Sequence, residues 1–352
     1  MINIPELERE PDQEISAYRS YYHSEVLPYF EQNGQQDFFN GVDDTSIAYV
    51  HFQHPNERGA LVILHGLNET ALKYAELIYD LRDSGLSIYI MEHRGHGNSE
   101  RILDGSDRER RKVFVKDFDH YVQDAKIFYD TIVSAGDHDH YFFFAHSLGG
   151  NVATQYLQRY PDDFDGAVLS SPMLEMLTTH PAVLPEGIVY PLVKFLTSAG
   201  LGKAYVVDMK EPDIIIDSTD QNKFEAELLT KSWKRWTVYN GLLEQNQQLI
   251  AGGAGATWGI TNQWAKEAYE ATFIARNTQN AAKIAVPILM FTSGEDYMAG
   301  QKGFDFLEER SVNSPEFEVV HFEKAYHESY IEVDEIRDQV IGKTKQFIES
   351  YY

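Results

Sequence analysis

The chain has 352 residues, of which 43% are hydrophobic and 13% aromatic. This composition allows one large folded core and excludes a largely disordered protein. Acidic residues outnumber basic ones by 55 to 30, and the resulting formal charge of −25 would repel phosphate backbones, which argues against nucleic-acid binding. The chain contains no cysteine, which excludes disulfides and thiolate metal sites.

The N-terminal segment MINIPELEREPDQEIS is acidic and lacks the basic start and the apolar stretch of a signal peptide. No apolar run reaches the roughly eighteen residues that a membrane-spanning helix requires. We therefore expect a cytoplasmic protein without stable membrane insertion. The sequence leaves the oligomeric state open.

Short apolar runs with the β-branched or aromatic content of buried strands recur along the chain. They are ALVILH (60–65), SIYIM (87–91), YFFFA (141–145), GAVLSS (166–171), VPILMFT (286–292) and EFEVVHF (316–322). Between them, apolar residues recur at spacings of four and three from Phe114 to Ile132, and a similar face runs from Val333 to Phe347, which predicts amphipathic helices. Strands that alternate with such helices predict an α/β fold with a mostly parallel sheet covered on both faces.

This alternation stops between about Pro172 and Ile284, where EGIVYPLVKFLTSAG and LLTKSWKRWTVYNGLLEQ indicate helices. We interpret residues 172–281 as a helical insertion, with residues 1–171 and 282–352 as the core, because strands resume beyond it. The insertion contains all the tryptophans of the chain: Trp233, Trp236, Trp258 and Trp264. Such side chains suit a pocket for an acyl chain and its polar head, although packing within the insertion would also explain them.

The segment YFFFAHSLGGNVA (141–153) places Ser147 between a predicted strand and small residues suited to a helix. A tight strand-to-helix turn needs small residues on either side of its apex, and here Ala145 and Gly149 give the pattern A-x-S-x-G. At such a turn the hydroxyl projects above the sheet, and the helix offers its N-terminal amides to an oxyanion. Ser147 is therefore predicted to be a nucleophile, with a helix N-cap as the alternative.

A nucleophilic serine needs a base to accept its proton and an acid to orient that base. In PILMFTSGEDYMA, Asp296 lies just beyond the end of a predicted strand, and in FEVVHFEKAYHES, His327 lies on the loop after the next strand. Active sites of open α/β sheets lie at the carboxyl ends of the strands, so both groups can meet Ser147 there.

Other residues compete for these two roles. Glu295 precedes Asp296 and lies closer to the strand, and Glu175 follows the strand that ends at Ser171. His321 falls within an apolar strand pattern, so we expect it to be structural.

The loop LHGLNET follows the first buried strand, and His65 and Gly66 open it. Its glycine permits close approach of the backbone, so the amide of Leu67 could point at the nucleophile beside the amide of Leu148. Two such donors form an oxyanion hole, and each is worth about 3 kcal/mol in the transition state. A plain turn would explain the same four residues HGLN.

No cofactor or metal site is predicted. HRGH (93–96) lies in a glycine-rich loop, and DHDH (137–140) precedes a strand as a solvated turn. GGAGATWG (252–259) lacks the preceding strand and the spacing of a phosphate loop, so we interpret it as a flexible segment.

Taken in chain order, LHGLNET, MEHRGHGNSE, FAHSLGGNVA, SGEDYMA and AYHES resemble the motifs of the α/β-hydrolase superfamily. They are most similar to its serine-hydrolase branch of bacterial lysophospholipases and monoacylglycerol lipases, and KVFVKDFDHYVQDAKIFYD (112–130) resembles a helix of L2-type lysophospholipases. The resemblance runs from about residue 45 to the end. Two positions depart from the family pattern: Glu92 replaces the usual aspartate of D-x-R-G-x-G-x-S, and Ala145 replaces glycine.

This resemblance implies an α/β-hydrolase fold with residues 172–281 as a cap. It implies a catalytic triad of Ser147, Asp296 and His327, oxyanion amides at Leu67 and Leu148, and no cofactor. The implied activity is hydrolysis of the acyl ester of a lysophospholipid or monoacylglycerol through an acyl-enzyme. The expected partner is this small amphipathic ester, with transient contact to lipid aggregates.

Several other functions stay open on the same motifs. An aminopeptidase, a perhydrolase or a carbon–carbon bond hydrolase could use the same serine, acid and base, because fold does not fix the reaction. A non-catalytic ligand-binding protein on the same fold is a further alternative.

Overall fold

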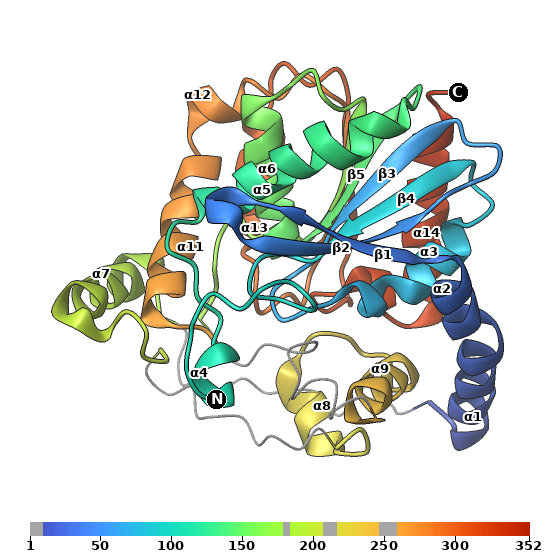
Figure 1. The fold of residues 1–352 in the computed structure, drawn as a ribbon, viewed down its shortest axis with the longest axis horizontal. Helices are drawn as coiled ribbons and strands as arrows, with labels where there is room; N and C mark the ends of the chain where they lie inside the picture. The colour runs from blue at the N-terminus through green and yellow to red at the C-terminus, as the bar shows by residue number, and fades with distance from the viewer. Residues whose placement is uncertain (1–9, 179–183, 207–216, 246–258) are drawn as a thin grey trace.

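The structure is a computed structural model that describes residues 10–178, 184–206, 217–245 and 259–352. Its centre is one eight-stranded sheet with the order β1-β2-β4-β3-β5-β6-β7-β8 (Figure 1). The strands are β1 (Gln35–Asn40), β2 (Ser46–Phe52), β3 (Gly59–Leu64), β4 (Leu86–Met91), β5 (Tyr141–His146), β6 (Gly166–Ser170), β7 (Ile288–Ser293) and β8 (Phe317–Phe322). β2 pairs antiparallel with both β1 and β4, and the other neighbours are parallel.

The predicted strands correspond to β3 through β8, and the α/β fold class with a mostly parallel sheet is confirmed. β1 and β2 were not predicted. Phe39 is the buried residue of β1, whose other side chains are exposed. A strand that buries so little of its surface leaves no apolar run in the sequence.

Helices connect the strands and cover the sheet. They are α1 (Asp12–Tyr21), α2 (Leu27–Asn33), α3 (Ala75–Leu81), α4 (Asp107–Arg110), α5 (Asp119–Phe128), α6 (Leu148–Arg159), α7 (Glu186–Leu196), α8 (Gln221–Glu227), α9 (Trp233–Gln245), α11 (Asn262–Ala275), α12 (Thr278–Ala281), α13 (Gln301–Arg310) and α14 (Asp334–Glu349). Among the residues described, no helix combines the length and the apolar character that crossing a bilayer requires.

Both faces of the sheet are buried. Because successive side chains of a strand point to opposite faces, Val62 and Phe143 pack in one core with residues of α5, α6 and α11, whereas Leu61 and Phe142 pack in another with residues of α3 and α14. The ribbon shows the two helical layers on opposite sides of the sheet (Figure 1). The central strands are apolar on both faces for this reason, and their carboxyl ends carry the loops described below.

Between Pro172 and Ile284 the described regular elements are helices, joined by turns and by short bridges at Met176 and Tyr205, and the predicted helices there correspond to α7 and α9. Trp233 and Trp236 stack at 5.2 Å between ring centroids and pack with Phe224 and Ile15, and Trp264 is buried in the main core. Trp258 and most of GGAGATWG lie outside the described residues. Packing therefore explains the three described tryptophans, and the bounds 172–281 stay a prediction.

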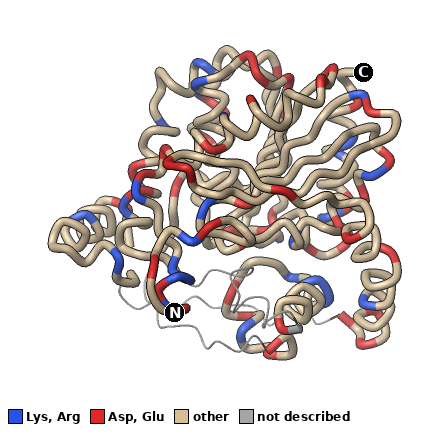
Figure 2. The backbone as a smooth tube through the Cα atoms, in the orientation of Figure 1, with Lys and Arg blue, Asp and Glu red and all other residues tan. Residues whose placement is uncertain are grey.

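Acidic residues are spread over most elements and alternate with basic ones (Figure 2). Some of this charge is structural. The buried carboxylate of Asp124 on α5 binds Arg94 through both of its oxygens, at 2.6 and 2.7 Å, and accepts a hydrogen bond from the amide of Val42 at 2.8 Å. This pair fixes α5 to the loop that follows β4.

Candidate active site

Ser147 lies at the junction of β5 and α6. Its backbone, with φ 49° and ψ −111°, has a conformation that residues other than glycine rarely adopt. The turn is crowded. A Cβ at Gly149 would collide with the carbonyl oxygen of Leu64, and one at Gly150 would lie 2.7 Å from Pro172. Ser147 is partly exposed, whereas His146 and Leu148 on either side are buried. The fold therefore presents this hydroxyl at the carboxyl edge of the sheet.

The structure brings the three predicted triad residues together in one hydrogen-bonded line. His327 Nε2 lies 2.8 Å from Ser147 Oγ, and His327 Nδ1 lies 2.8 Å from Asp296 Oδ2. The side chains of His327 and Asp296 are only 5% and 2% exposed. In this arrangement Nδ1–H donates to the carboxylate, and Nε2 is left to accept the serine proton.

Asp296 is held on the loop after β7 by its own backbone. Its Oδ1 accepts hydrogen bonds from the amides of Met298 and Ala299, at 2.8 and 2.9 Å. Burial alone would raise the pKa of Asp296, but the His327 side chain and these amides hold it below its ordinary value. Asp296 is therefore an anion at neutral pH.

Burial alone would lower the pKa of His327, but the charge of Asp296 and the hydrogen bond to it outweigh this effect and raise the pKa above its ordinary value. A base with a raised pKa is a stronger acceptor for the serine proton. The geometry and the electrostatics thus favour the same direction of proton transfer.

The reaction of Ser147 with a fluorophosphonate should depend on pH through His327. The base must be neutral to accept a proton, so the labelling rate falls as the pH falls through its pKa. Because that pKa is raised, we expect the midpoint of the acidic limb to lie above about 6.5, the ordinary histidine value. The variant His321→Gln, changed at an exposed position of β8, should have the same midpoint. A midpoint below about 6 in the wild type would contradict this expectation.

The competing residues make other contacts. Glu295 Oε2 binds Lys231 Nζ at 2.9 Å, and Glu175 Oε1 lies 3.9 Å from Lys302 Nζ. His321 Nδ1 lies 2.9 Å from Thr292 Oγ1, at an exposed position of β8. The acid that reaches His327 is thus Asp296.

The loop after β3 lies beside the start of α6, because β3 and β5 are neighbours and Leu64 pairs with Ala145. The amide of Gly149 donates to the carbonyl of His65 at 3.1 Å, which joins the loop to the helix. Leu148 is the first residue of α6, where an amide has no acceptor within its own helix. The role of the Leu67 and Leu148 amides as oxyanion donors stays a prediction.

Glu92, the departure from the family pattern, connects two loops. Its buried carboxylate accepts from the amide of Ala71 at 2.9 Å and from the amide of Asn98 at 2.6 Å. A Cβ at Gly97 would collide with it, so the loop closes tightly around the longer side chain. The described contacts of Glu92 are therefore structural.

The histidines of HRGH are engaged in the same way. The amide of His93 donates to His65 Nε2 at 2.9 Å, and His93 Nε2 lies 3.0 Å from the carbonyl oxygen of His65. Burial lowers the pKa of His93, and it lowers that of His96 to about 3. Both rings are therefore neutral. His93 binds the backbone of the loop after β3, whereas His96 Nδ1 lies 3.1 Å from the carbonyl oxygen of Arg94 in the loop after β4.

One group near the site was missed by the sequence analysis. Among the described residues, Glu69, His146 and Glu328 form the single group whose ligand atoms lie within 4.8 Å of one another, as a metal site requires. The ammonium group of Lys73, however, binds both carboxylates. The four-residue spacing of Glu69 and Lys73 is also that of an ordinary surface ion pair, so it did not single out this cluster.

Comparison with known proteins agrees with this geometry. The family model of serine aminopeptidases (S33) matches residues 55–334. The chain is 27% identical to the probable lysophospholipase L2 of Haemophilus influenzae, over 93% of this chain and 97% of that protein. It is 25% identical to the monoacylglycerol lipase of Mycolicibacterium smegmatis, over 84% and 91%.

A solved structure shares the fold. It is a soluble variant of monoglyceride lipase from Saccharomyces cerevisiae in complex with a substrate analog, with a TM-score of 0.65, 16% identity, and coverage of 90% of this chain and 94% of that chain.

Proposed function

The chain belongs to the serine aminopeptidase S33 family and has the α/β-hydrolase fold, and on that premise we propose that it is a serine carboxylic-ester hydrolase. Its proposed substrate is a lysophospholipid or a monoacylglycerol, each of which carries a single acyl ester. The observation that carries the proposal is the line Ser147–His327–Asp296, with 2.8 Å at each step. Relatives named as a lysophospholipase and a monoacylglycerol lipase, similar over most of the chain, support the lipid ester.

The reaction follows from the arrangement of the side chains. His327 accepts the proton of Ser147 as Oγ attacks the ester carbonyl, and Asp296 stabilises the resulting imidazolium. The amides of Leu67 and Leu148 hold the negative oxygen of the tetrahedral intermediate. His327 then protonates the departing glycerol oxygen, and a water activated by the same ring releases the fatty acid.

Residues 172–281 are the proposed cap over this site. Contacts between residues 229–235 and the loop after His327 support this role. The amide of Glu328 donates to the carbonyl of Leu229 at 2.8 Å, and Thr230 Oγ1 donates to the carbonyl of Ile331 at 2.9 Å. Arg235 donates to the carbonyl of Glu332 at 2.8 Å. This segment therefore lies against the proposed base.

Fatty-acid release tests the proposal. We expect the enzyme to hydrolyse lysophosphatidylcholine, a monoacylglycerol or both faster than a short-chain nitrophenyl ester, because the proposed site holds an acyl chain. Hydrolysis of the short ester alone would contradict the lipid substrate while keeping the esterase.

The description of the matching family favours a second candidate, an aminopeptidase that uses the same triad. An aminoacyl nitroanilide belongs in the same assay, and its exclusive hydrolysis would replace the esterase with this candidate. A cytoplasmic location and the absence of nucleic-acid partners stay predictions.

A further inference from the structure

A buried cluster of charges lies directly behind the proposed triad. Lys73 is in the short 3-10 turn Ala71–Tyr74 that follows the loop of Leu67. Its ammonium group lies 3.0 Å from Glu69 Oε1 and also donates to Glu328 Oε1. The side chains of Lys73, Glu69 and Glu328 are 8%, 3% and 4% exposed.

Glu69 holds the loop that carries one proposed oxyanion amide. Its Oε2 accepts from the amide of Gly66 at 2.5 Å and from the hydroxyl of Tyr74 at 2.7 Å. Its Oε1 accepts from the hydroxyl of Tyr330 at 3.1 Å. A Cβ at Gly66 would lie 2.9 Å from this carboxylate, so loop and carboxylate are in direct contact. The position of Leu67, the next residue, depends on this contact.

Glu328 holds the loop that carries the base. It follows His327 in the chain, and its amide is bonded to the carbonyl of Leu229. The ring of His327 lies 4.7 Å from that of His146, and His146 Nε2 lies 3.8 Å from Glu69 Oε1. The cluster is thus connected to the catalytic groups in three places: Glu69 binds the oxyanion loop, Glu328 follows the base His327, and His146 precedes Ser147.

The two carboxyl groups of the cluster have pKa values shifted in opposite directions. Burial alone would raise the pKa of Glu69, but Lys73 and the polar groups around it hold the pKa below its ordinary value. Burial raises the pKa of Glu328 to about 7 and lowers that of His146 to about 3. One buried cation, Lys73, therefore binds both carboxyl groups beside a neutral imidazole ring.

A buried ion pair is a costly way to stabilise a fold, because desolvation offsets most of its attraction. It does fix geometry, since each group must keep its partner. We propose that Lys73 is a positioning residue: through Glu69 and Glu328 its ammonium group fixes the loop of Leu67 relative to His327, and so sets the distance between oxyanion amides and base. This inference rests on the proposed function.

The variant Lys73→Met tests this role because methionine preserves most of the side-chain volume and removes the charge. We expect kcat for a nitrophenyl butyrate to fall about 10- to 100-fold, since displacement of catalytic groups by about 1 Å has effects of that size. KM should stay within about 2-fold, because the Lys73 side chain is only 8% exposed and we expect no contact between it and the substrate. Lys73→Arg keeps the cation and should recover most of kcat.

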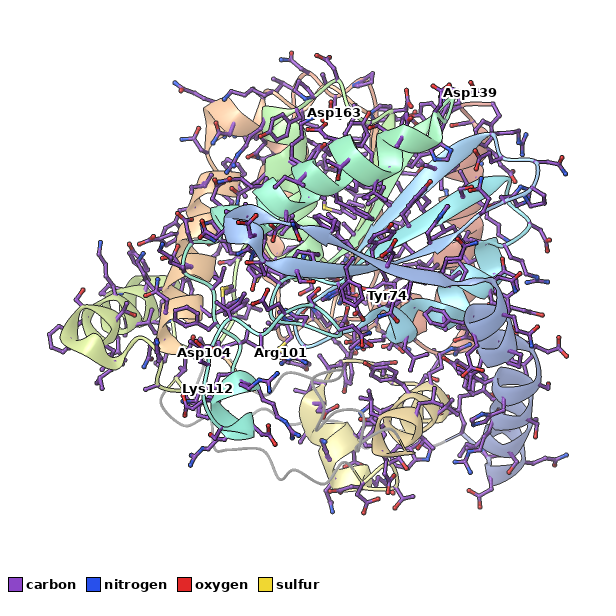
Figure 3. All side chains as sticks on the ribbon, viewed as in Figure 1. Tyr74, Arg101, Asp104, Lys112, Asp139 and Asp163 are labelled. Atoms are coloured by element: carbon purple, nitrogen blue, oxygen red, sulfur yellow. The ribbon has the colours of Figure 1, made fainter. Side chains whose placement is uncertain are left out.

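Lys126 offers a control of the same residue type at a more exposed position, with its side chain 23% exposed. It also binds two carboxylates, Asp130 at 2.6 Å and Asp163 at 3.0 Å. Its ammonium group lies over two tyrosine rings, as that of Lys73 lies over the ring of Tyr239. Asp163 lies past the C-terminal end of α6, whereas Ser147 lies at the start of that helix, and Figure 3 shows Asp163 near the top of the molecule and Tyr74 well below it. Lys126→Met should therefore keep the wild-type kcat.

A second variant covers the case in which Lys73→Met does not fold. Glu328→Gln keeps the pair of Lys73 and Glu69 and should lower kcat about 3- to 10-fold with an unchanged melting temperature. The proposal is overturned if folded Lys73→Met stays within 2-fold of the wild-type kcat, if KM changes in place of kcat, or if Lys126→Met loses as much. It is also overturned if Lys73→Met fails to fold and Glu328→Gln is fully active.

The two proposals fail in different ways. If the wild type hydrolyses no ester, the proposed function is wrong. The positioning role is then judged by the rate of fluorophosphonate labelling of Ser147, which needs the same alignment of serine, base and amides and which Lys73→Met should slow by the same factor.

Discussion

Replacing Ser147 with alanine should lower ester hydrolysis by about 10⁴- to 10⁶-fold, the range seen when the nucleophile of a serine hydrolase is removed. The hydroxyl is the group that forms the acyl-enzyme. It lies 2.8 Å from His327 Nε2, and alanine has no atom there that could act as the nucleophile. The fold should survive, because the side chain is partly exposed and alanine keeps the crowded turn small.

Ser171 provides a closely matched control for this experiment. It also has a positive φ, of 41°, and it directly follows β6, the strand next to β5. Ser171→Ala should keep turnover within about 2-fold and should still react with a fluorophosphonate. Retention of more than about 1% of wild-type kcat by Ser147→Ala, with circular dichroism unchanged, would contradict the assignment of the nucleophile.

Replacing Asp296 with asparagine should lower kcat by about 10³- to 10⁴-fold while KM changes little. The amide has nearly the shape of the carboxylate but would donate to His327 Nδ1. That contact forces the proton onto Nε2, the atom that must accept from Ser147. The expected loss of kcat therefore comes from the wrong protonation state of His327 and not from altered packing.

The neighbouring carboxylate, Glu295, is the control for this substitution. Glu295→Gln removes the same charge one residue earlier, where the carboxylate binds Lys231 at 2.9 Å. We expect kcat for this variant within about 3-fold of the wild type. A greater loss for Glu295→Gln than for Asp296→Asn would reverse the choice between the two acids.

Much of this architecture could be read from the sequence because the parallel strands are buried on both faces. β3 and β5 form continuous apolar runs for that reason, and the carboxyl ends of such strands are where the loops with Ser147, Asp296 and His327 were expected. The elbow was predictable from Gly149, whose small size is required by contact with the backbone of Leu64.

The charge cluster could not be read in the same way. Glu69 and Lys73 have the spacing of an ordinary surface ion pair on a helix. Their burial comes from Tyr74 and Tyr330, which lie 256 positions apart in the chain and stack at 4.9 Å. Local patterns do not report contacts over such separations.

Two helices of the same region differ in how they are attached, and this difference bears on how the protein could diverge. Thr230, just before α9, and Arg235, in its first turn, are hydrogen-bonded to the loop after His327, so selection for turnover should restrain mutation there. α7 instead meets α11 through Tyr190–Glu270 and Glu186–Arg276, and it exposes Ile188, Leu192 and Phe195. In duplicated genes we therefore expect α7 to accept substitutions more readily than the start of α9.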